Sequence, residues 1–163
     1  MKVTVRNYRP RDKAFLVHCM NGMQEHVFSI DAFKKTLPVS QFSGERWVNT
    51  ILKKIKKYNG IILMAQLRGK AVGCVVGIIK ESTTVDLIDL FPFKDGRIIE
   101  LFVEPLHRKL GVGSLLLKKI EQFFRAHGCG MSELGVFATN TNAFKFYKKY
   151  GYSERNVDMG KKL

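Results

Sequence analysis

The stretch Ile98–Phe124 constrains the fold most, because a strand, a glycine-containing turn and a helix follow one another directly in it. Ile98–Val103 is a short run of aliphatic and aromatic residues around one glutamate, a pattern typical of a buried strand. Pro105 ends the strand, because proline has no N–H to donate to a ladder. From Val112 onward apolar residues recur at helical spacing, and Gly128 indicates the end of that helix.

The turn Arg108–Gly113 has the properties of an anion site. The first amides of a helix lack intrahelical acceptors, and the helix dipole is positive there. The two glycines let the backbone approach a phosphate, and the first two residues add positive charge. A Walker loop is excluded because no Gly-Lys-Ser/Thr follows. A dinucleotide turn is the lesser alternative: Glu133 has suitable spacing, but Leu116 occupies the place of the third glycine.

An Arg-x-x-Gly-x-Gly turn directly after a strand that ends Phe-Val resembles the pyrophosphate loop of the GNAT superfamily, the acyl-CoA-dependent N-acyltransferases. Ala71–Ile79 looks like the third strand of that family, and Leu134–Asn140 looks like the strand that follows the loop helix. Asn140–Gly151 matches the family pattern Asn-x-x-Ala-x-x-Phe-Tyr-Lys-x-x-Gly, and Tyr152–Leu163 looks like the closing strands. The resemblance covers Gly60–Leu163 well and the first third of the chain in outline.

The resemblance implies an α/β (α+β) fold in one N-acetyltransferase domain over residues 1–163. Its sheet would be mixed and mostly antiparallel, with six to seven strands and about four flanking helices. Strands come in pairs as often as they alternate with helices, which also favours this class. In the family the fourth and fifth strands splay apart to admit acyl-CoA. Here these strands would be Arg97–Glu104 and Ser132–Ala138.

The remaining elements are expected from periodicity and from turn residues. The expected elements are a strand at Lys2–Arg9, a helix from Asp12 that breaks or bends near Gly22, a loop or short helix over residues 24–43, a helix at Glu45–Tyr58, a hairpin of Ile61–Leu67 and Ala71–Lys80, and a long connection at Glu81–Gly96.

Composition narrows the class of protein. The chain has 163 residues, 45% of them hydrophobic, which suits one globular domain. The net charge of +14 fits the phosphates of CoA, nucleic acid or an acidic protein acceptor, or serves solubility alone. Nucleic acid is disfavoured, because neither an RRM-type strand nor a zinc finger is visible. The sequence has no apolar run of membrane-spanning length and no signal-peptide core, so we expect a cytoplasmic protein without a membrane partner.

Metal and disulfide chemistry are not expected. The three cysteines form no Cys-x-x-Cys pair, and the four histidines show no ligand spacing. We therefore predict reduced thiols and no metal. Acetyl-CoA is the expected cosubstrate, an amine is the expected acceptor, and the chain is expected as a monomer or homodimer.

Two side chains are the candidates for catalysis. By the resemblance, Tyr147 is the general acid that protonates the CoA sulfur; its alternative role is that of an aromatic core residue. Glu100 is a carboxylate in an apolar strand, which is costly unless it is paired or functional. It is the candidate base or amine anchor, and a structural ion pair with Arg97 is the alternative. Glu104 is a weaker candidate, and some family members use only water as base.

The resemblance also implies a cofactor-binding set, in which the Val103 backbone N–H polarises the thioester and Asn140 either binds pantetheine or caps the next helix. The set is Leu101, Phe102, Val103, Arg108, Lys109, Leu110, Gly111, Val112, Gly113, Ser114, Asn140, Asn142, Phe146 and Tyr147. For the acceptor, Asp86, Asp89 and Glu100 would suit a cationic amine such as a polyamine, an aminoglycoside or a lysine side chain.

Two other functions remain open on the sequence. A basic nucleic-acid-binding protein would use the turn to hold backbone phosphate. A non-catalytic acyl-CoA-binding module would have the turn but would not require Tyr147 or Glu100.

Overall fold

The computed structural model describes residues 2–163, which fall into two compact units. The first unit runs to Met20 and resumes over Ser43–Gly135. The second unit combines Asn21–Phe42 with Val136–Leu163. Helix α1, Lys13–Ile30, contributes residues to both.

The first unit is built on a five-stranded sheet with its strands in chain order. The strands are β1 (Val3–Asn7), β2 (Ile61–Leu67), β3 (Lys70–Glu81), β4 (Lys94–Val103) and β5 (Met131–Glu133). Neighbours from β1 to β4 are antiparallel, whereas β5 is parallel to β4. The expected mixed, mostly antiparallel sheet is confirmed.

Four α-helices occur in the described residues, as expected. Besides α1 they are α2 (Gly44–Lys57), α3 (Val112–Ala126) and α4 (Thr141–Lys149), and short 3₁₀ turns lie at η1 (Pro10–Asp12), η2 (Asp86–Ile88) and η3 (Pro105–His107). Ser43 caps α2 by accepting a hydrogen bond from the Arg46 backbone N–H, which explains why that helix begins at Gly44.

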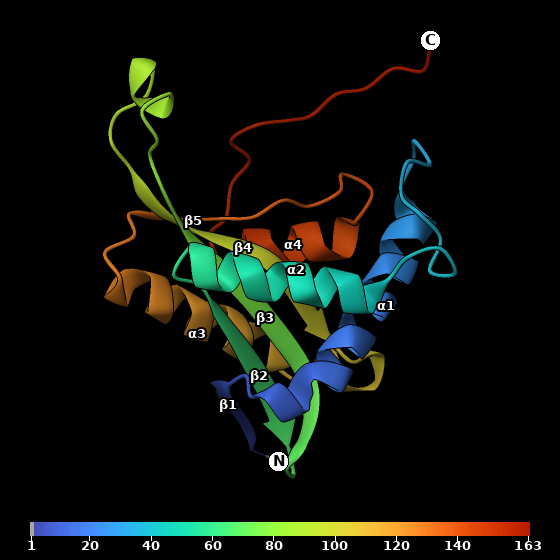
Figure 1. The fold of residues 1–163 in the computed structure, drawn as a ribbon. Helices are drawn as coiled ribbons and strands as arrows, with labels where there is room; N and C mark the ends of the chain where they lie inside the picture. The colour runs from blue at the N-terminus through green and yellow to red at the C-terminus, as the bar shows by residue number, and fades with distance from the viewer. Residues whose placement is uncertain (1) are drawn as a thin grey trace. The chain divides into compact units, whose positions relative to one another are not determined.

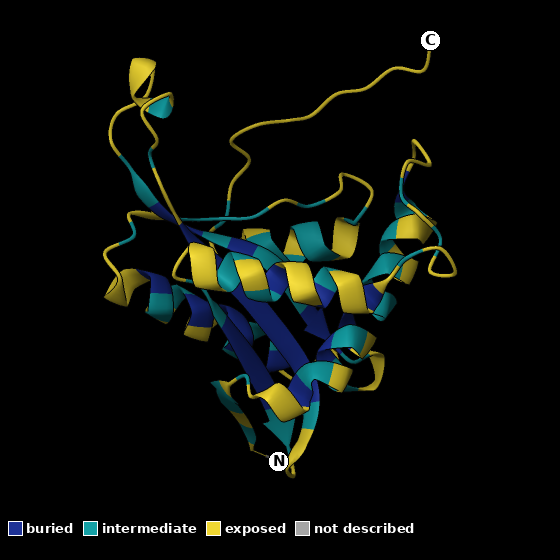
Figure 2. Ribbon diagram, viewed as in Figure 1, coloured by how far each residue is buried: buried dark blue, intermediate teal, exposed yellow. Residues whose placement is uncertain are grey.

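The sheet of the first unit is covered on both faces. Helix α3 packs on one face, where Phe124 lies directly over Gly96 and Gly77. The first half of α1 packs on the other face, where Cys19 lies against Cys74 of β3, and α2 crosses that same face (Figure 1). Figure 2 shows the central strands as the most buried part of the sheet.

Gly96 is required by the packing of α3. A Cβ at this position would lie 2.1 Å from Cγ of Phe124, whose ring is fully buried and cannot move aside cheaply. We expect Gly96→Ala to lower the free energy of unfolding by about 1–3 kcal/mol, the usual cost of overpacking. Urea denaturation measures this. In the control Gly130→Ala the added Cβ meets nothing closer than 3.8 Å, so an equal loss in both variants would contradict the packing argument.

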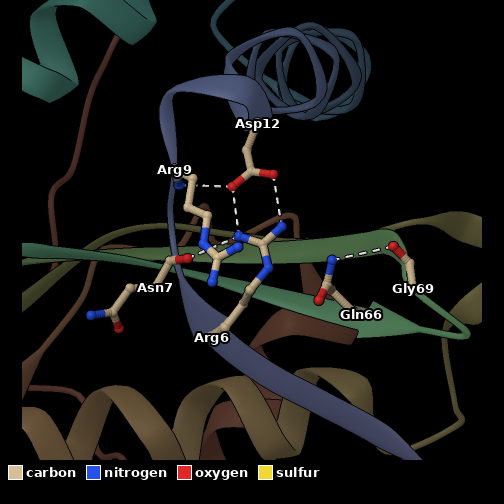
Figure 3. Close-up of polar contacts among 6 residues, drawn as sticks. All are labelled: Arg6, Asn7, Arg9, Asp12, Gln66 and Gly69. Atoms are coloured by element: carbon tan, nitrogen blue, oxygen red, sulfur yellow. Dashed lines mark hydrogen bonds and ion pairs between the residues drawn. The ribbon is translucent and has the colours of Figure 1, made fainter.

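Asp12, in the 3₁₀ turn that precedes α1, connects this turn to β1 by hydrogen bonds. Its carboxylate accepts hydrogen bonds from Arg6 Nη1 at 2.6 Å and Nη2 at 2.8 Å, and from the Arg9 backbone N–H at 2.7 Å (Figure 3). The bond from Arg6 is the main reason why the pKa of Asp12 lies below its ordinary value. Asp12 thus fixes the direction in which the chain leaves the sheet.

A hairpin arm, Ser82–Phe93, connects β3 and β4 and extends past the end of their ladder (Figures 1 and 2). Its apolar side chains before Phe93 are exposed, including Ile88 at 81% and Phe91 at 92%. Asp86 accepts hydrogen bonds from the backbone and hydroxyl of Thr83, which closes the turn at the tip.

In the second unit, Asp31 organises the loop that follows α1. The buried carboxylate accepts hydrogen bonds from the backbone N–H groups of Phe33, Lys35 and Thr36, and from the Thr36 hydroxyl. These bonds, led by that of Thr36, lower the pKa of Asp31 to about 2. The Thr139 hydroxyl donates to the carbonyl of Ile30, which fastens the later part of the unit to the end of the helix.

Several expected boundaries are wrong. The sheet has five strands instead of six to seven, and β5 ends at Glu133, so neither Ser132–Ala138 nor Leu134–Asn140 is a strand. Tyr152–Leu163 forms no strand in the described chain, and the apolar side chains after Tyr152, such as Met159 at 93%, are exposed. Helix α1 runs unbroken through Gly22.

Candidate functional site

A bulge in β4 decides which face of the sheet Glu100 occupies. In the β3–β4 register Gly77 pairs with Ile98 and Val76 pairs with Glu100, so Ile99 is an extra residue. Successive side chains of a regular strand alternate, which would turn Glu100 toward α3 together with Gly96. The extra residue reverses the alternation, and Glu100 therefore faces α2.

Glu100 is held by a tryptophan from α2. Trp47 Nε1 donates a hydrogen bond of 2.8 Å to Glu100 Oε1, and Lys54 Nζ lies 5.4 Å from the centre of the Trp47 ring. Burial raises the pKa of Glu100 from 4.5 to about 7, although the Trp47 hydrogen bond and the Lys54 charge oppose the rise. A carboxyl group that titrates near neutral pH suits general base catalysis.

Sequence reasoning found Glu100 but not its partner. The suggested ion pair with Arg97 is wrong, because Arg97 Nη1 lies 3.7 Å from Glu133 Oε2. The signal for Trp47 was its indole N–H, which usually finds an acceptor when the ring is partly buried. Nothing in the sequence pairs it with a residue 53 positions away.

The parallel ladder between β4 and β5 is short. It covers Asp95 to Arg97 on β4 and ends at the pair Arg97–Glu133, while β4 continues to Val103 without a partner from β5. The other edge of β4 stays paired with β3 to its end. On this edge, and within residues 2–163, β4 therefore runs without a strand partner from Ile98 onward, because β5 ends at Glu133 and is shorter than expected.

The turn after β4 reverses the chain by two residues in the left-handed region. Lys109 has φ +60° and Gly111 has φ +78°, and α3 begins at the next residue, Val112. Arg108 Nε donates a hydrogen bond of 3.0 Å to the Val103 carbonyl, which anchors the turn to the end of the strand. The terminal nitrogens of Arg108 donate to no acceptor within residues 2–163. A Cβ on Gly111 would meet no atom within 4 Å, so the turn is open on that side.

The other residues of the first unit that are predicted to bind the cofactor differ in which of their atoms a ligand can reach. The side chains of Phe102, Val103 and Val112 are buried, which leaves only their backbone for a ligand. Leu110 is exposed at 61%, and the amide of Gly113 belongs to the first turn of α3, where a helix has no intrahelical acceptors. Leu101 and Ser114 are half-buried.

A histidine that the sequence did not single out lies beside the strand. His18 Nε2 on α1 is 2.7 Å from Glu104 Oε1, and its ring meets that of Phe102 edge-on at 6.3 Å. Glu104 is thus a paired carboxylate, which weakens it as the alternative base. The position of His18 on the helix face that packs against the sheet is the one sequence signal that could have indicated this contact.

The remaining predicted residues lie in the second unit, on and before α4. Asn140 caps the helix, because its Oδ1 accepts a hydrogen bond of 3.2 Å from the Ala143 backbone N–H. The capping alternative is confirmed. Tyr147 lies in an aromatic cluster, with ring centres 5.2 Å from Phe146 and 5.6 Å from Tyr152. Asn142 is exposed in the first turn of the helix.

Among residues 2–163 no group of three or more His, Cys, Asp or Glu side chains is placed to hold a metal ion. Over the same residues, none of the helices has both the length and the apolarity that crossing a bilayer requires.

Comparison with known proteins shows which family this sequence resembles. The profile of the acetyltransferase (GNAT) family matches residues 29–152. Two uncharacterized N-acetyltransferases of Methanocaldococcus jannaschii are 26% identical over 120 residues and 30% identical over 128 residues. These alignments cover 73% and 78% of this chain, but 51% and 69% of the two relatives. The chain thus spans about half the length of the first relative.

The fold is similar to that of a solved structure. A tetramutant of the BH1408 protein from Bacillus halodurans has a TM-score of 0.84 to this chain, with 19% sequence identity and coverage of 98% and 99% of the two chains. That likeness concerns the fold, whereas the family profile spans most of the sequence, including β4, the turn and α3. The chain belongs to the acetyltransferase (GNAT) family.

Proposed function

We propose that residues 1–163 form a single N-acetyltransferase domain that transfers the acetyl group of acetyl-CoA to a primary amine by direct attack on the thioester. The observation that carries this proposal is Glu100. It is a carboxyl group with a pKa near 7, turned by a bulge toward α2, on the strand that leads into the turn from Arg108 to Gly113. Neither a nucleic-acid-binding protein nor a non-catalytic acyl-CoA-binding module requires a carboxyl group with a raised pKa on β4.

In the proposed reaction each group has one task. The turn from Arg108 to Gly113 binds the diphosphate of CoA, and the Val103 backbone N–H stabilises the oxyanion. The amine nitrogen attacks the thioester carbon while Glu100 takes its proton. The carbon–sulfur bond then breaks, and the thiolate takes a proton from the hydroxyl of Tyr147. The products are the N-acetyl amine and free CoA.

A thiol-release assay with acetyl-CoA and a panel of primary amines tests the proposal. Amine-dependent release of CoA supports it. Binding of acetyl-CoA without release under any condition would support a non-catalytic module. Strongly salt-dependent binding of RNA or DNA without affinity for CoA would support the nucleic-acid alternative.

Removing the hydroxyl of Tyr147 tests the proposed acid. We expect Tyr147→Phe to lower kcat by about 10²-fold, because a positioned general acid contributes about that much or more. The affinity for acetyl-CoA should change little, since the aromatic contacts with Phe146 and Tyr152 need only the ring. The matched control is Tyr150→Phe in the same cluster. Equal turnover in wild type and Tyr147→Phe would exclude Tyr147 as the acid.

A further inference from the structure

The hydrogen bond from Trp47 fixes how Glu100 can work. An indole N–H donates and never accepts, so Glu100 Oε1 must act as the acceptor of that bond. A proton on the carboxyl group therefore resides on Oε2, which has no hydrogen-bond partner among the described residues. Oε2 is thus the atom that receives the proton of the acceptor amine. One carboxyl group that is half neutral near pH 7 is suited to deprotonate one ammonium group, but it is a poor anchor for a second.

The other carboxylates on and next to β4 already have partners. Glu104 is paired with His18 at 2.7 Å, and Glu133 lies 3.7 Å from Arg97. Asp95 is buried and accepts a hydrogen bond of 3.0 Å from the Met131 backbone N–H. A second ammonium group on the acceptor would find none of these carboxylates free.

The acidic residues of the hairpin arm are too remote to help. Glu100 pairs with Val76, whereas the arm begins beyond the pair Glu81–Lys94. Six residues of strand span about 20 Å. Moreover, the Asp86 carboxylate is engaged by Thr83. This separation argues against Asp86 and Asp89 acting together with Glu100 on one cationic amine.

The local charge that acts on Glu100 is positive. Lys54, stacked over Trp47, is the charged side chain that acts on the Glu100 carboxyl group. Helix α2 carries five basic residues, and its one acidic residue, Glu45, is paired with Lys13 at 3.0 Å. The whole chain has a net charge of +14. Such a field attracts anions and repels polycations.

We propose that the acceptor is a primary amine that also carries an anionic group, either a carboxylate or a phosphate, and that polyamines are disfavoured. This inference rests on the proposed acetyl transfer. Lys54 contributes the local positive charge that favours the anionic group, while Glu100 Oε2 takes the proton of the ammonium group. The inference concerns the choice among amines and leaves the chemistry of the transfer unchanged.

Pairs of acceptors that differ only in charge test the inference on the full chain with acetyl-CoA. L-lysine is compared with cadaverine, which lacks only the carboxylate, and glucosamine 6-phosphate is compared with glucosamine. A lysine peptide flanked by aspartates is compared with the same peptide flanked by arginines. We expect kcat/KM to be at least about tenfold higher for the anionic member of the preferred pair, and the ratio to shrink as salt is added. The pair with the largest ratio identifies carboxylate, phosphate or acidic peptide as the source of the charge.

A variant connects the preference to α2. Lys54→Gln should reduce the ratio within the preferred pair, whereas Lys70→Gln, at the start of β3 and remote from Glu100, should not. Lys54→Gln also changes the pKa of Glu100. This change affects kcat/KM for both acceptors of a pair equally, so their ratio reports only the charge preference. Higher kcat/KM for cadaverine or the arginine peptide, or ratios near one, would overturn the inference but leave the proposed function intact. If no amine is acetylated, both fail together.

Discussion

Glu100→Gln is expected to lower kcat by about 10²- to 10⁴-fold, because glutamine has no basic oxygen to take the amine proton. Wild-type kcat/KM should rise with pH through about 7, where Glu100 loses its proton, and the variant should show no such rise. Initial rates of thiol release between about pH 5.5 and pH 9 measure both effects. An unchanged kcat would mean that water or another group acts as base.

The same variant should be more stable than wild type at alkaline pH. The pKa of Glu100 is 4.5 as a free side chain and about 7 in the fold, so folding favours the neutral form. This contribution to stability is present below pH 4.5 and is lost as pH rises through 7. Glutamine stays neutral and keeps an oxygen for the Trp47 bond, so we expect a higher Tm than wild type at about pH 8.5. Glu81→Gln, at the exposed end of β3, is the control and should leave both activity and Tm unchanged.

Arg108→Ala is expected to raise the Kd for acetyl-CoA by about 10- to 100-fold. One hydrogen bond from a charged group contributes about 1.5–3 kcal/mol, and about 1.4 kcal/mol corresponds to a factor of ten. The variant also loses the bond from Arg108 Nε to the Val103 carbonyl, which positions the turn. Calorimetric titration well below the unfolding temperature gives the change in Kd.

The matched control for this loss is Arg125→Ala. Arg125 is exposed in the last turn of α3 and pairs with Glu121 at 3.2 Å. The substitution Arg125→Ala therefore removes one positive charge, as Arg108→Ala does, but at a place remote from the turn Arg108–Gly113. Its Kd should stay within about twofold of wild type, since an exposed ion pair contributes little. If both variants weaken binding equally, the effect is one of net charge and the turn is not the phosphate site.

Local signals were sufficient for the turn and for the helix after it. Pro105, Gly111 and Gly128 are residues whose backbone preferences act over a few positions, and α3 indeed begins at Val112 and ends at Ala126. The apolar face of helix α2 was likewise sufficient to predict that helix from the sequence. Predictions of this kind need no knowledge of distant partners.

Features that depend on pairing between distant segments were not predictable in the same way. The bulge at Ile99 follows from the register with β3, and the sequence of β4 alone places no extra residue there. The bond between Trp47 and Glu100 joins α2 to that bulge. The end of β5 at Glu133 depends on where its ladder with β4 stops. The candidate base was thus identified from sequence, but the contacts that set its pKa required the structure.

The turn from Arg108 to Gly113 must bind the diphosphate of CoA if the proposed acetyl transfer takes place here. Isothermal titration of the full chain with CoA, acetyl-CoA and pantetheine tests this most directly. We expect one molecule of CoA or acetyl-CoA per chain with a Kd between about 1 μM and 1 mM, the usual range for enzyme substrates, and far weaker binding of pantetheine, which lacks the diphosphate. Absence of saturable binding of CoA, or equal affinity for pantetheine, would contradict the account.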